Sequence, residues 1–259
     1  MEGNQTFWDH LDTMRAGLLR VAAVLIVGMV GFFMVMPRLF DRLILAPTRE
    51  DFILYRLLAA IAGEGSPLGS QPLEVELINI HVASQFTTHL SSAFYAALLV
   101  AIPYLIYEVW RFIRPALYAE ERGKVRTAFL AGSLLFYAGC AVGYLIIFPL
   151  TFRFLAQYSL SEAIATQLSL QSYMNNFLGI TLVMGLAFEL PMVVWLLARL
   201  GIVSREMLRK GRRYAAVILL VASAFITPSG DPFTLAVVFT PLYLLYEAGI
   251  RCTPKEKNN

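Results

Sequence analysis

Long apolar runs, separated by shorter polar segments, dominate the chain. Six of them stand out, at residues 17–36, 90–109, 128–148, 177–198, 214–226 and 233–246. The first four are long enough to cross a hydrocarbon core of about 30 Å at a helical rise of about 1.5 Å per residue. The last two are short enough for either to be a buried half-helix. Because the turn 227–232 between them is rich in breakers, we favour a short hairpin that thins the bilayer locally.

The overall composition indicates that lipid, not water, surrounds most of these runs. Of the 259 residues, 58% are hydrophobic and 15% are charged, whereas soluble domains carry about 25% charged residues. In lipid every backbone polar group must be satisfied within the protein, which favours helices. Alternation of apolar and polar residues predicts a short strand or extended edge at 73–80. The sequence therefore predicts a single domain over residues 1–259, an all-α integral membrane protein with six transmembrane helices, the last two short.

Positive charges predict the orientation of these helices. If the N-terminus is cytoplasmic, 16 of the 21 Lys and Arg residues lie inside. The five outside are Arg38, Arg42, Arg49, Arg56 and Arg153. Because Lys and Arg concentrate on the cytoplasmic side, both termini are expected in the cytoplasm, as an even number of spans requires. The chain is thus expected to be a multi-pass protein of the cell inner (cytoplasmic) membrane.

Two acidic residues in or beside the apolar runs are candidates for function. Glu189 lies deep within the fourth run, where an ionisable group costs about 2.5–3.5 kcal/mol on insertion scales and is a functional candidate by default. The alternative is a protonated carboxyl group hydrogen-bonded to a neighbouring helix. Pro191 is expected to free the backbone carbonyl of Ala187. Asp231, in the turn before the sixth run, suits a turn position or the N-cap of the last helix.

Acidic residues also occur on the predicted cytoplasmic side, at Asp12, Glu120 and Glu121. They are either solvated partners of nearby arginines or acceptors for a guanidinium, which binds a carboxylate through a planar two-point fork. No HExxH, CxxC, GxSxG or P-loop motif occurs in the sequence. The chain is therefore not expected to be an enzyme, and no metal or cofactor is expected.

Two other classes of function compete at this point. A proton- or ion-coupled transporter would use Glu189 as a relay, but it needs further ionisable groups facing Glu189 at mid-membrane, and none stands out in the six runs. An intramembrane enzyme needs a nucleophile and a base, and no such pair is visible in the sequence.

Several short strings then occur in one order along the chain. They are FWDHLDTMR at 7–15, YEVWRFIRPALY at 107–118 followed by Glu121 and Arg122, SLLFYAG at 133–139, FPL at 148–150, FELP at 188–191, RRY at 212–214, TP at 227–228 with Asp231, PL at 241–242 and YE at 246–247. In these strings the chain resembles the TatC family, the multispanning subunit of the twin-arginine protein translocase. The resemblance covers about residues 7–250, and the stretch 110–121 is its most specific part.

The resemblance implies a receptor for signal peptides with two adjacent arginines, and a core subunit of a translocase that exports folded proteins across the cytoplasmic membrane, driven by the proton-motive force. The implied partners are these peptides, small single-span subunits of the TatA/TatB type, the lipid bilayer and further copies in an oligomeric complex, with no nucleic acid. The signal-peptide-binding residues implied by motif matches are Glu121, Asp12, Arg15, Leu18, His10, Phe112 and Pro115. Those implied for assembly with partner helices are Glu189, Thr227 and Asp231.

The chain departs from the family pattern at three places. Thr13 stands where the family has a glutamate two residues before the arginine of its N-terminal motif. The adjacent Asp12 is the available substitute, but it points elsewhere on a helix that turns about 100° per residue. The outer turn, TPSGD, is one residue longer than the family's TPPD, which blurs the match at Asp231. Leu235 replaces a glutamine often seen in the family, so the polar patch that includes Thr227 is expected to be reduced.

Overall fold

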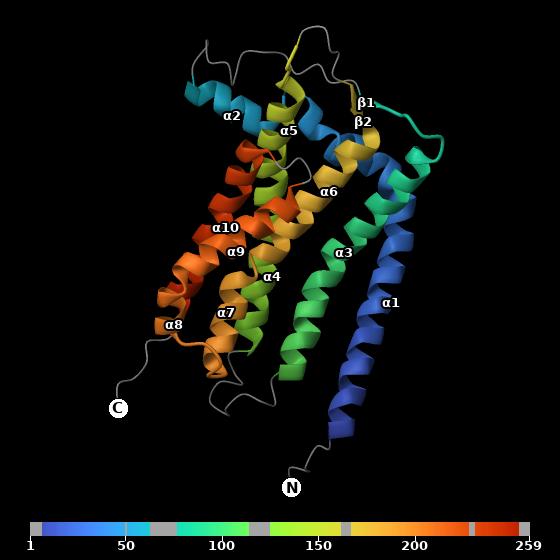
Figure 1. The fold of residues 1–259 in the computed structure, drawn as a ribbon. Helices are drawn as coiled ribbons and strands as arrows, with labels where there is room; N and C mark the ends of the chain where they lie inside the picture. The colour runs from blue at the N-terminus through green and yellow to red at the C-terminus, as the bar shows by residue number, and fades with distance from the viewer. Residues whose placement is uncertain are drawn as a thin grey trace. The chain divides into compact units, whose positions relative to one another are not determined.

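Helices make up most of the part of the chain that the structure describes, which is residues 7–49, 51–62, 77–113, 125–161, 167–227 and 231–253 of a computed structural model. The α-helices are α1 (Phe7–Leu39), α2 (Ile53–Ala62), α3 (Ser84–Ile113), α4 (Val125–Val142), α5 (Phe148–Gln157), α6 (Leu170–Ala187), α7 (Leu190–Arg199), α8 (Arg205–Lys210), α9 (Arg212–Ile226) and α10 (Pro232–Cys252). The other described elements are the π-helices η1 (Phe40–Ile44) and η5 (Gly143–Ile147), the 3-10 helix η2 (Ala46–Thr48), and the strands β1 (Leu77–Ile78) and β2 (Leu168–Ser169) (Figure 1).

The chain divides into two compact units. The first unit contains Met1–Met36 and His89–Leu134, and the second contains Pro37–Thr88 and Leu135–Asn259. The helices α1, α3 and α4 each continue across a boundary between the units. The expectation of a single domain over residues 1–259 stays a prediction.

Five helical runs within the described residues are long and apolar enough to cross a membrane. They are Asp12–Ala60, Ser84–Phe112, Leu130–Gln157, Leu170–Arg199 and Pro232–Cys252. These runs contain four of the six predicted spans and all but the first two residues of the span predicted at 128–148, which confirms the prediction of an all-α chain with several helices of membrane-spanning length. The remaining predicted span corresponds to α9, whose 15 residues are fewer than the roughly 20 that a full crossing needs. The count of six spans and the side on which the termini lie stay predictions.

The final helix is longer than its apolar run predicts. The run ends at residue 246, but α10 continues to Cys252 and has 21 residues. Glu247, just beyond the run, pairs with Arg212 of α9, at 2.7 Å from Nε to Oε1 and 2.8 Å from Nη2 to Oε2. Glutamate is a good helix former, so its charge ends the apolar run without ending the helix. The prediction that the last helix is short is therefore wrong.

In the first unit, α1 and α3 lie side by side and antiparallel (Figure 1). The ring of His89 stacks on that of Phe33 with centroids 4.0 Å apart, and its Nε2 lies 2.8 Å from the Phe33 carbonyl oxygen. Further along, a Cβ added at Gly28 would lie 3.3 Å from the Cβ of Ala97. None of residues 18–35 of α1 is buried. α3 therefore holds α1 along one narrow line and leaves most of its apolar side chains exposed.

In the second unit, α4 and the following η5 approach α6 closely at glycines. A Cβ added at Gly139 would lie 2.5 Å from the carbonyl oxygen of Met184 and 2.8 Å from the Cβ of Phe188. One added at Gly143 would lie 3.0 Å from the Cα of Thr181. Small residues four apart let two helix backbones come together. This contact fixes α6, and with it the start of the loop that carries Glu189.

An aromatic cluster forms the core of the second unit where η5 and α5 meet α6. The ring of Phe148 lies 5.2 Å from that of Tyr173, edge to face, which is a geometry that aromatic pairs favour. Tyrosine hydroxyl groups then tie the connection between α1 and α2 to this core. Tyr144 donates to the carbonyl of Leu43 at 2.8 Å, and Tyr173 donates to the carbonyl of Ile44. This connection is therefore fixed through its backbone.

A two-stranded parallel pair lies in the second unit. β1 pairs with β2, with Leu77 opposite Leu168 and Ile78 opposite Ser169. The strand predicted at 73–80 is thus confirmed at residues 77–78, while residues 73–76 lie outside the described part of the chain. β2 also places Ser169 at the N-cap of α6, where its side chain accepts a hydrogen bond from the Ser172 amide. The pair therefore helps to define where α6 begins.

Candidate functional site

The residues predicted to bind a signal peptide are only partly within the described chain. The exposed ones on the N-terminal third of α1 are Asp12, Arg15 and Leu18. Phe112, in the last turn of α3, is 37% exposed. His10 belongs to α1, but its side chain lies outside what the structure describes, as do Pro115 and Glu121 entirely. The described residues nevertheless suffice to define a site on the first unit.

A cavity of about 220 Å³ lies between the start of α1 and the end of α3 in the first unit. Its lining residues are Thr13, Met14, Gly17, Leu18, Arg20, Val21, Leu105, Glu108, Val109, Arg111 and Phe112. Because the two helices are antiparallel, the cavity brings together Leu18 and Phe112 of the predicted set, whereas Asp12 and Arg15 are not among the lining residues. Pockets for drug-sized ligands are about 300–1,000 Å³, so this volume suits one or two side chains.

Glu108 is the acidic group of this cavity. Its side chain is 9% exposed, and its Oε1 accepts hydrogen bonds from Arg20 Nη1 at 2.7 Å and from the Tyr104 hydroxyl at 2.9 Å. Its Oε2 lies 3.9 Å from Arg111 Nη1. A carboxylate taken out of water is stable only with such partners. The cavity therefore already holds one carboxylate between two guanidinium groups.

The sequence analysis missed Arg20 and Glu108. Both lie inside predicted apolar runs, near the run ends, where only Glu189 was singled out. The signal was present, because any ionisable side chain within such a run is a functional candidate by default. The sequence does not show that these two side chains meet, and so it does not give the cavity beside them.

Glu189 lies at a break between α6 and α7 in the second unit. Its amide donates to the Leu186 carbonyl at 3.1 Å, and its own carbonyl accepts from the Val193 amide at 2.9 Å. Pro191 has no N–H to offer the carbonyl of Ala187, which explains why the helical ladder stops and restarts here. Oε1 of Glu189 is buried and makes no hydrogen bond to any residue that the structure describes. An acceptor in that state is suited to a donor from another chain.

Thr227 and Asp231, the other two residues predicted to contact partner helices, have local structural roles. Thr227 is 2% exposed, and its hydroxyl donates to the carbonyl of Ser223 at 2.9 Å. Asp231 is the N-cap of α10, and its Oδ1 accepts from the Thr234 amide at 2.7 Å. Residues 228–230 between them lie outside the described chain. The N-cap alternative for Asp231 is thus confirmed, and Glu189 is the better candidate for a partner contact.

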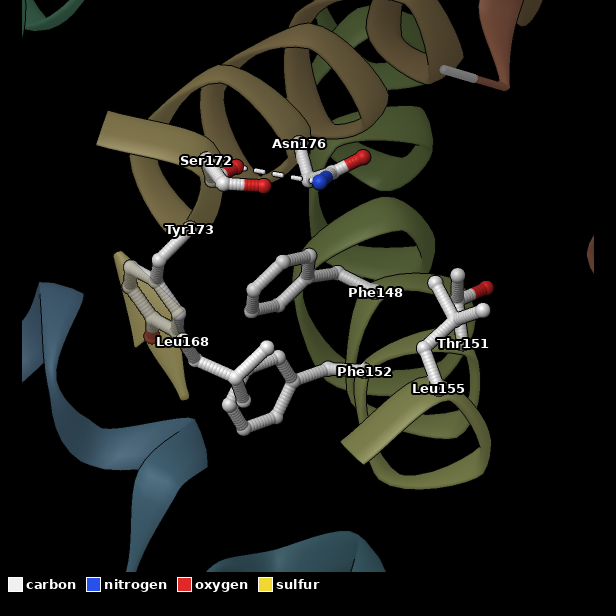
Figure 2. A pocket seen from close by; sticks show the side chains of 8 residues that line it. All are labelled: Phe148, Thr151, Phe152, Leu155, Leu168, Ser172, Tyr173 and Asn176. Carbon is white, nitrogen blue, oxygen red and sulfur yellow. Dashed lines mark hydrogen bonds between the residues drawn. The ribbon is translucent and has the colours of Figure 1, made fainter. Parts of the chain in front are cut away.

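A second cavity, of about 70 Å³, lies within the aromatic core of the second unit. Its lining residues are Phe148, Thr151, Phe152, Leu155, Leu168, Ser172, Tyr173 and Asn176 (Figure 2). Figure 2 shows the rings of Phe148 and Phe152 facing Tyr173, and the side-chain amide of Asn176 donating to the Ser172 carbonyl. Thr151 Oγ1 and Asn176 Oδ1 are buried without a hydrogen bond to a described residue. A small cavity with two such polar atoms is suited to ordered water, and we treat it as structural.

Comparison with known proteins agrees with the sequence motifs. The pattern of one family, Sec-independent protein translocase protein (TatC), matches residues 9–241. The Sec-independent protein translocase protein TatC of Deinococcus radiodurans is 33% identical over 243 residues, which are 94% of this chain and 83% of the relative. That of Escherichia coli strain K12 is 36% identical over 197 residues, which are 76% of this chain and 74% of the relative.

Solved structures agree with the fold. Two crystal structures of the twin arginine translocase receptor TatC, one of them in DDM, are similar to this chain with TM-scores of 0.75 and 0.77, at 29% and 28% sequence identity. The similarity covers 94% and 95% of this chain, and 97% and 99% of the solved chains. The family pattern, the curated relatives and the fold thus agree over nearly the whole length. The chain therefore belongs to the TatC family, and is a multi-pass membrane subunit of the Sec-independent, twin-arginine protein translocase.

Proposed function

We propose that this chain is the signal-peptide receptor and core subunit of a translocase that exports folded proteins across the cell inner membrane. The observation that carries the proposal is the cavity between α1 and α3, where a mostly buried carboxylate lies beside apolar walls that include Leu18 and Phe112. Signal peptides of this class would offer guanidinium groups next to an apolar segment. Charge-assisted hydrogen bonds between guanidinium and carboxylate are both strong and directional.

The proposed topology has six spans with both termini in the cytoplasm. Five described helical runs have the length and apolarity to cross a membrane, and α9 would cross locally thinned bilayer. The excess of Lys and Arg in the segments assigned to the inside supports this orientation. In that topology the start of α1 and the end of α3 face the cytoplasm, where a newly made signal peptide is available. The absence of a P-loop motif in the sequence is consistent with energy from the proton-motive force.

Peptide binding to the full chain in detergent tests the receptor function. A labelled peptide with an arginine pair should bind more tightly than the same peptide with two lysines, because Lys cannot form the planar fork. Equal affinity for the two peptides would overturn the proposal.

Substitution of Glu121 tests which carboxylates take part in peptide binding. Glu121→Ala should weaken binding of the arginine-pair peptide about tenfold or more, the effect of losing one hydrogen bond to a charged group. Glu120→Ala is the matched control, since it removes the same charge from the neighbouring position and should change the affinity much less. Similar losses in both variants would mean that Glu121 has no special role.

Glu189 is proposed to bind the polar residue of a small single-span partner within the membrane. Its buried Oε1, which has no hydrogen-bond partner among the described residues, supports this role. Glu189→Ala should reduce crosslinking between α7 and a partner helix while leaving peptide binding largely intact. Unchanged crosslinking in that variant would count against the contact.

A further inference from the structure

The contact between Arg20 and Glu108 is end-on. One guanidinium nitrogen of Arg20 contacts one carboxylate oxygen, Nη1 to Oε1 at 2.7 Å. Another long-range pair, Arg212 with Glu247, is a two-point fork that uses both carboxylate oxygens. In the end-on pair, Oε2 of Glu108 has Arg111 at 3.9 Å, which is beyond hydrogen-bond distance. Glu108 therefore keeps an oxygen that a further guanidinium can engage.

The two arginines can leave more easily than the carboxylate can. The side chain of Arg20 is 41% exposed and that of Arg111 is 54% exposed, whereas that of Glu108 is 9% exposed. The Tyr104 hydroxyl also holds Glu108 in place from the preceding turn of α3. When another guanidinium replaces either one, the buried Glu108 carboxylate stays paired, so the exchange costs little. The arrangement is a fixed acceptor with replaceable donors.

The cavity next to Glu108 suits the rest of an arginine side chain. Met14, Leu18, Val109 and Phe112 give it apolar walls, and the methylene stem of arginine packs along apolar surface while its charged end reaches a polar partner. On the α1 side, Gly17 leaves Oε2 open, since a Cβ there would lie only 3.3 Å from it. Apolar walls that end in a carboxylate are complementary to an arginine.

We propose that Glu108 is a carboxylate of the signal-peptide site and that Arg20 occupies it as an internal competitor until an arginine of the peptide displaces it. The inference rests on the proposed receptor function and names one binding residue and one competing residue for it. Thr13, which stands where the family pattern has a glutamate, lines the same cavity, so Glu108 supplies the negative charge that this position lacks.

Binding of a labelled arginine-pair peptide to the full chain in detergent, at one fixed salt concentration, tests the proposal through the signs of two effects. Glu108→Gln should weaken binding about tenfold, the effect of losing one hydrogen bond to a charged group. Arg20→Gln should instead tighten binding about two- to fivefold, because the competing pair is removed. Arg38→Gln, an exposed position near the end of the same helix, is the control for the loss of one positive charge and should have little effect.

A second pair of variants tests access to Oε2 without changing any charge. Gly17→Ala should weaken peptide binding, because its Cβ crowds Glu108. Gly31→Ala on the same helix is the control, since a Cβ there meets no atom within 4 Å. The melting temperatures of these two glycine variants should stay near that of the unmodified chain.

The outcomes separate this inference from the receptor function. If the unmodified chain does not distinguish arginine-pair from lysine-pair peptides, the receptor function fails. If it does, but Arg20→Gln weakens binding together with Glu108→Gln, the pair is only a helix clamp and the inference is overturned. If Glu108→Gln instead strengthens retention of anionic phospholipid and leaves peptide binding unchanged, the cavity serves a lipid headgroup through its arginines, which also overturns the inference.

Discussion

The two units hold their helices together in different ways. In the second unit, close helix contacts at glycines, an aromatic cluster and tyrosine hydroxyl groups bound to backbone carbonyls fix α4, η5, α5 and α6. In the first unit, α1 meets α3 along a narrow line whose contacts include one stacked histidine, one glycine and one end-on ion pair. Regions with few buried contacts open most readily. The proposed binding cavity therefore lies in the less densely packed of the two units.

The largest expected effect is the loss of the central ring in the second unit. Phe148 is 1% exposed, and Phe148→Ala should lower the free energy of unfolding by about 3–5 kcal/mol, the usual range for a buried phenylalanine. Phe225→Ala is the matched control, because that side chain is 86% exposed and should contribute little. Denaturant titration in detergent measures both. If the two variants lost similar stability, the aromatic cluster would not be the core of the second unit.

The glycine contact between α4 and α6 should give the next largest effect. Gly139→Ala places a Cβ against the backbone carbonyl of Met184, which cannot move aside as a side chain can, and overpacking of this kind costs about 1–3 kcal/mol. Gly179→Ala on α6 meets no atom within 4 Å and should be neutral or slightly stabilising. The measurement is the midpoint of thermal unfolding. A stable Gly139→Ala variant would show that the two helices have room to separate.

Removal of a hydroxyl group that binds the connection between α1 and α2 should have a smaller effect on stability. Tyr173→Phe keeps the ring but removes the donor to the Ile44 carbonyl, which should lower stability by about 1 kcal/mol. Tyr158→Phe, at a 61% exposed side chain, is the control. Hydrogen exchange at residues 43–48 provides a local readout, because only the Tyr173 variant should speed it. Equal exchange in both would mean that the connection is held by other contacts.

Local rules accounted for much of the fold in advance. The apolar runs located the long helices, and Asp231 was recognised as suited to an N-cap. Pro191 was expected to free a backbone carbonyl, but the break between α6 and α7 was not predicted. Each of these expectations depends on a few neighbouring residues and on the backbone chemistry of proline or aspartate. Predictions of this kind need no knowledge of which helices are neighbours.

The sequence did not predict which helices are neighbours or which of their faces are in contact. In water an apolar stripe on a helix points to the core, but in lipid the outward face is equally apolar, so the periodicity of α1 does not indicate where α3 lies. For the same reason the sequence did not reveal that Arg20 pairs with Glu108, or that Arg212 of α9 pairs with Glu247 of α10. The cavity depends on that pairing, and so it could not be predicted from the sequence either.

Substitutions in the ion pairs Arg20–Glu108 and Arg212–Glu247 should have the smallest effects on stability. They test most directly how the two units differ. Arg212→Lys removes the two-point fork to Glu247 and should lower stability by less than about 1 kcal/mol, since the pair is partly exposed. Arg20→Lys should leave stability nearly unchanged, because a lysine can reproduce a single end-on contact. Thermal unfolding of the two variants, side by side at low and high salt, measures the difference. If Arg20→Lys were the more damaging of the two, α1 and α3 would depend on their ion pair as a clamp, and the arginine could not serve as a replaceable occupant of the cavity.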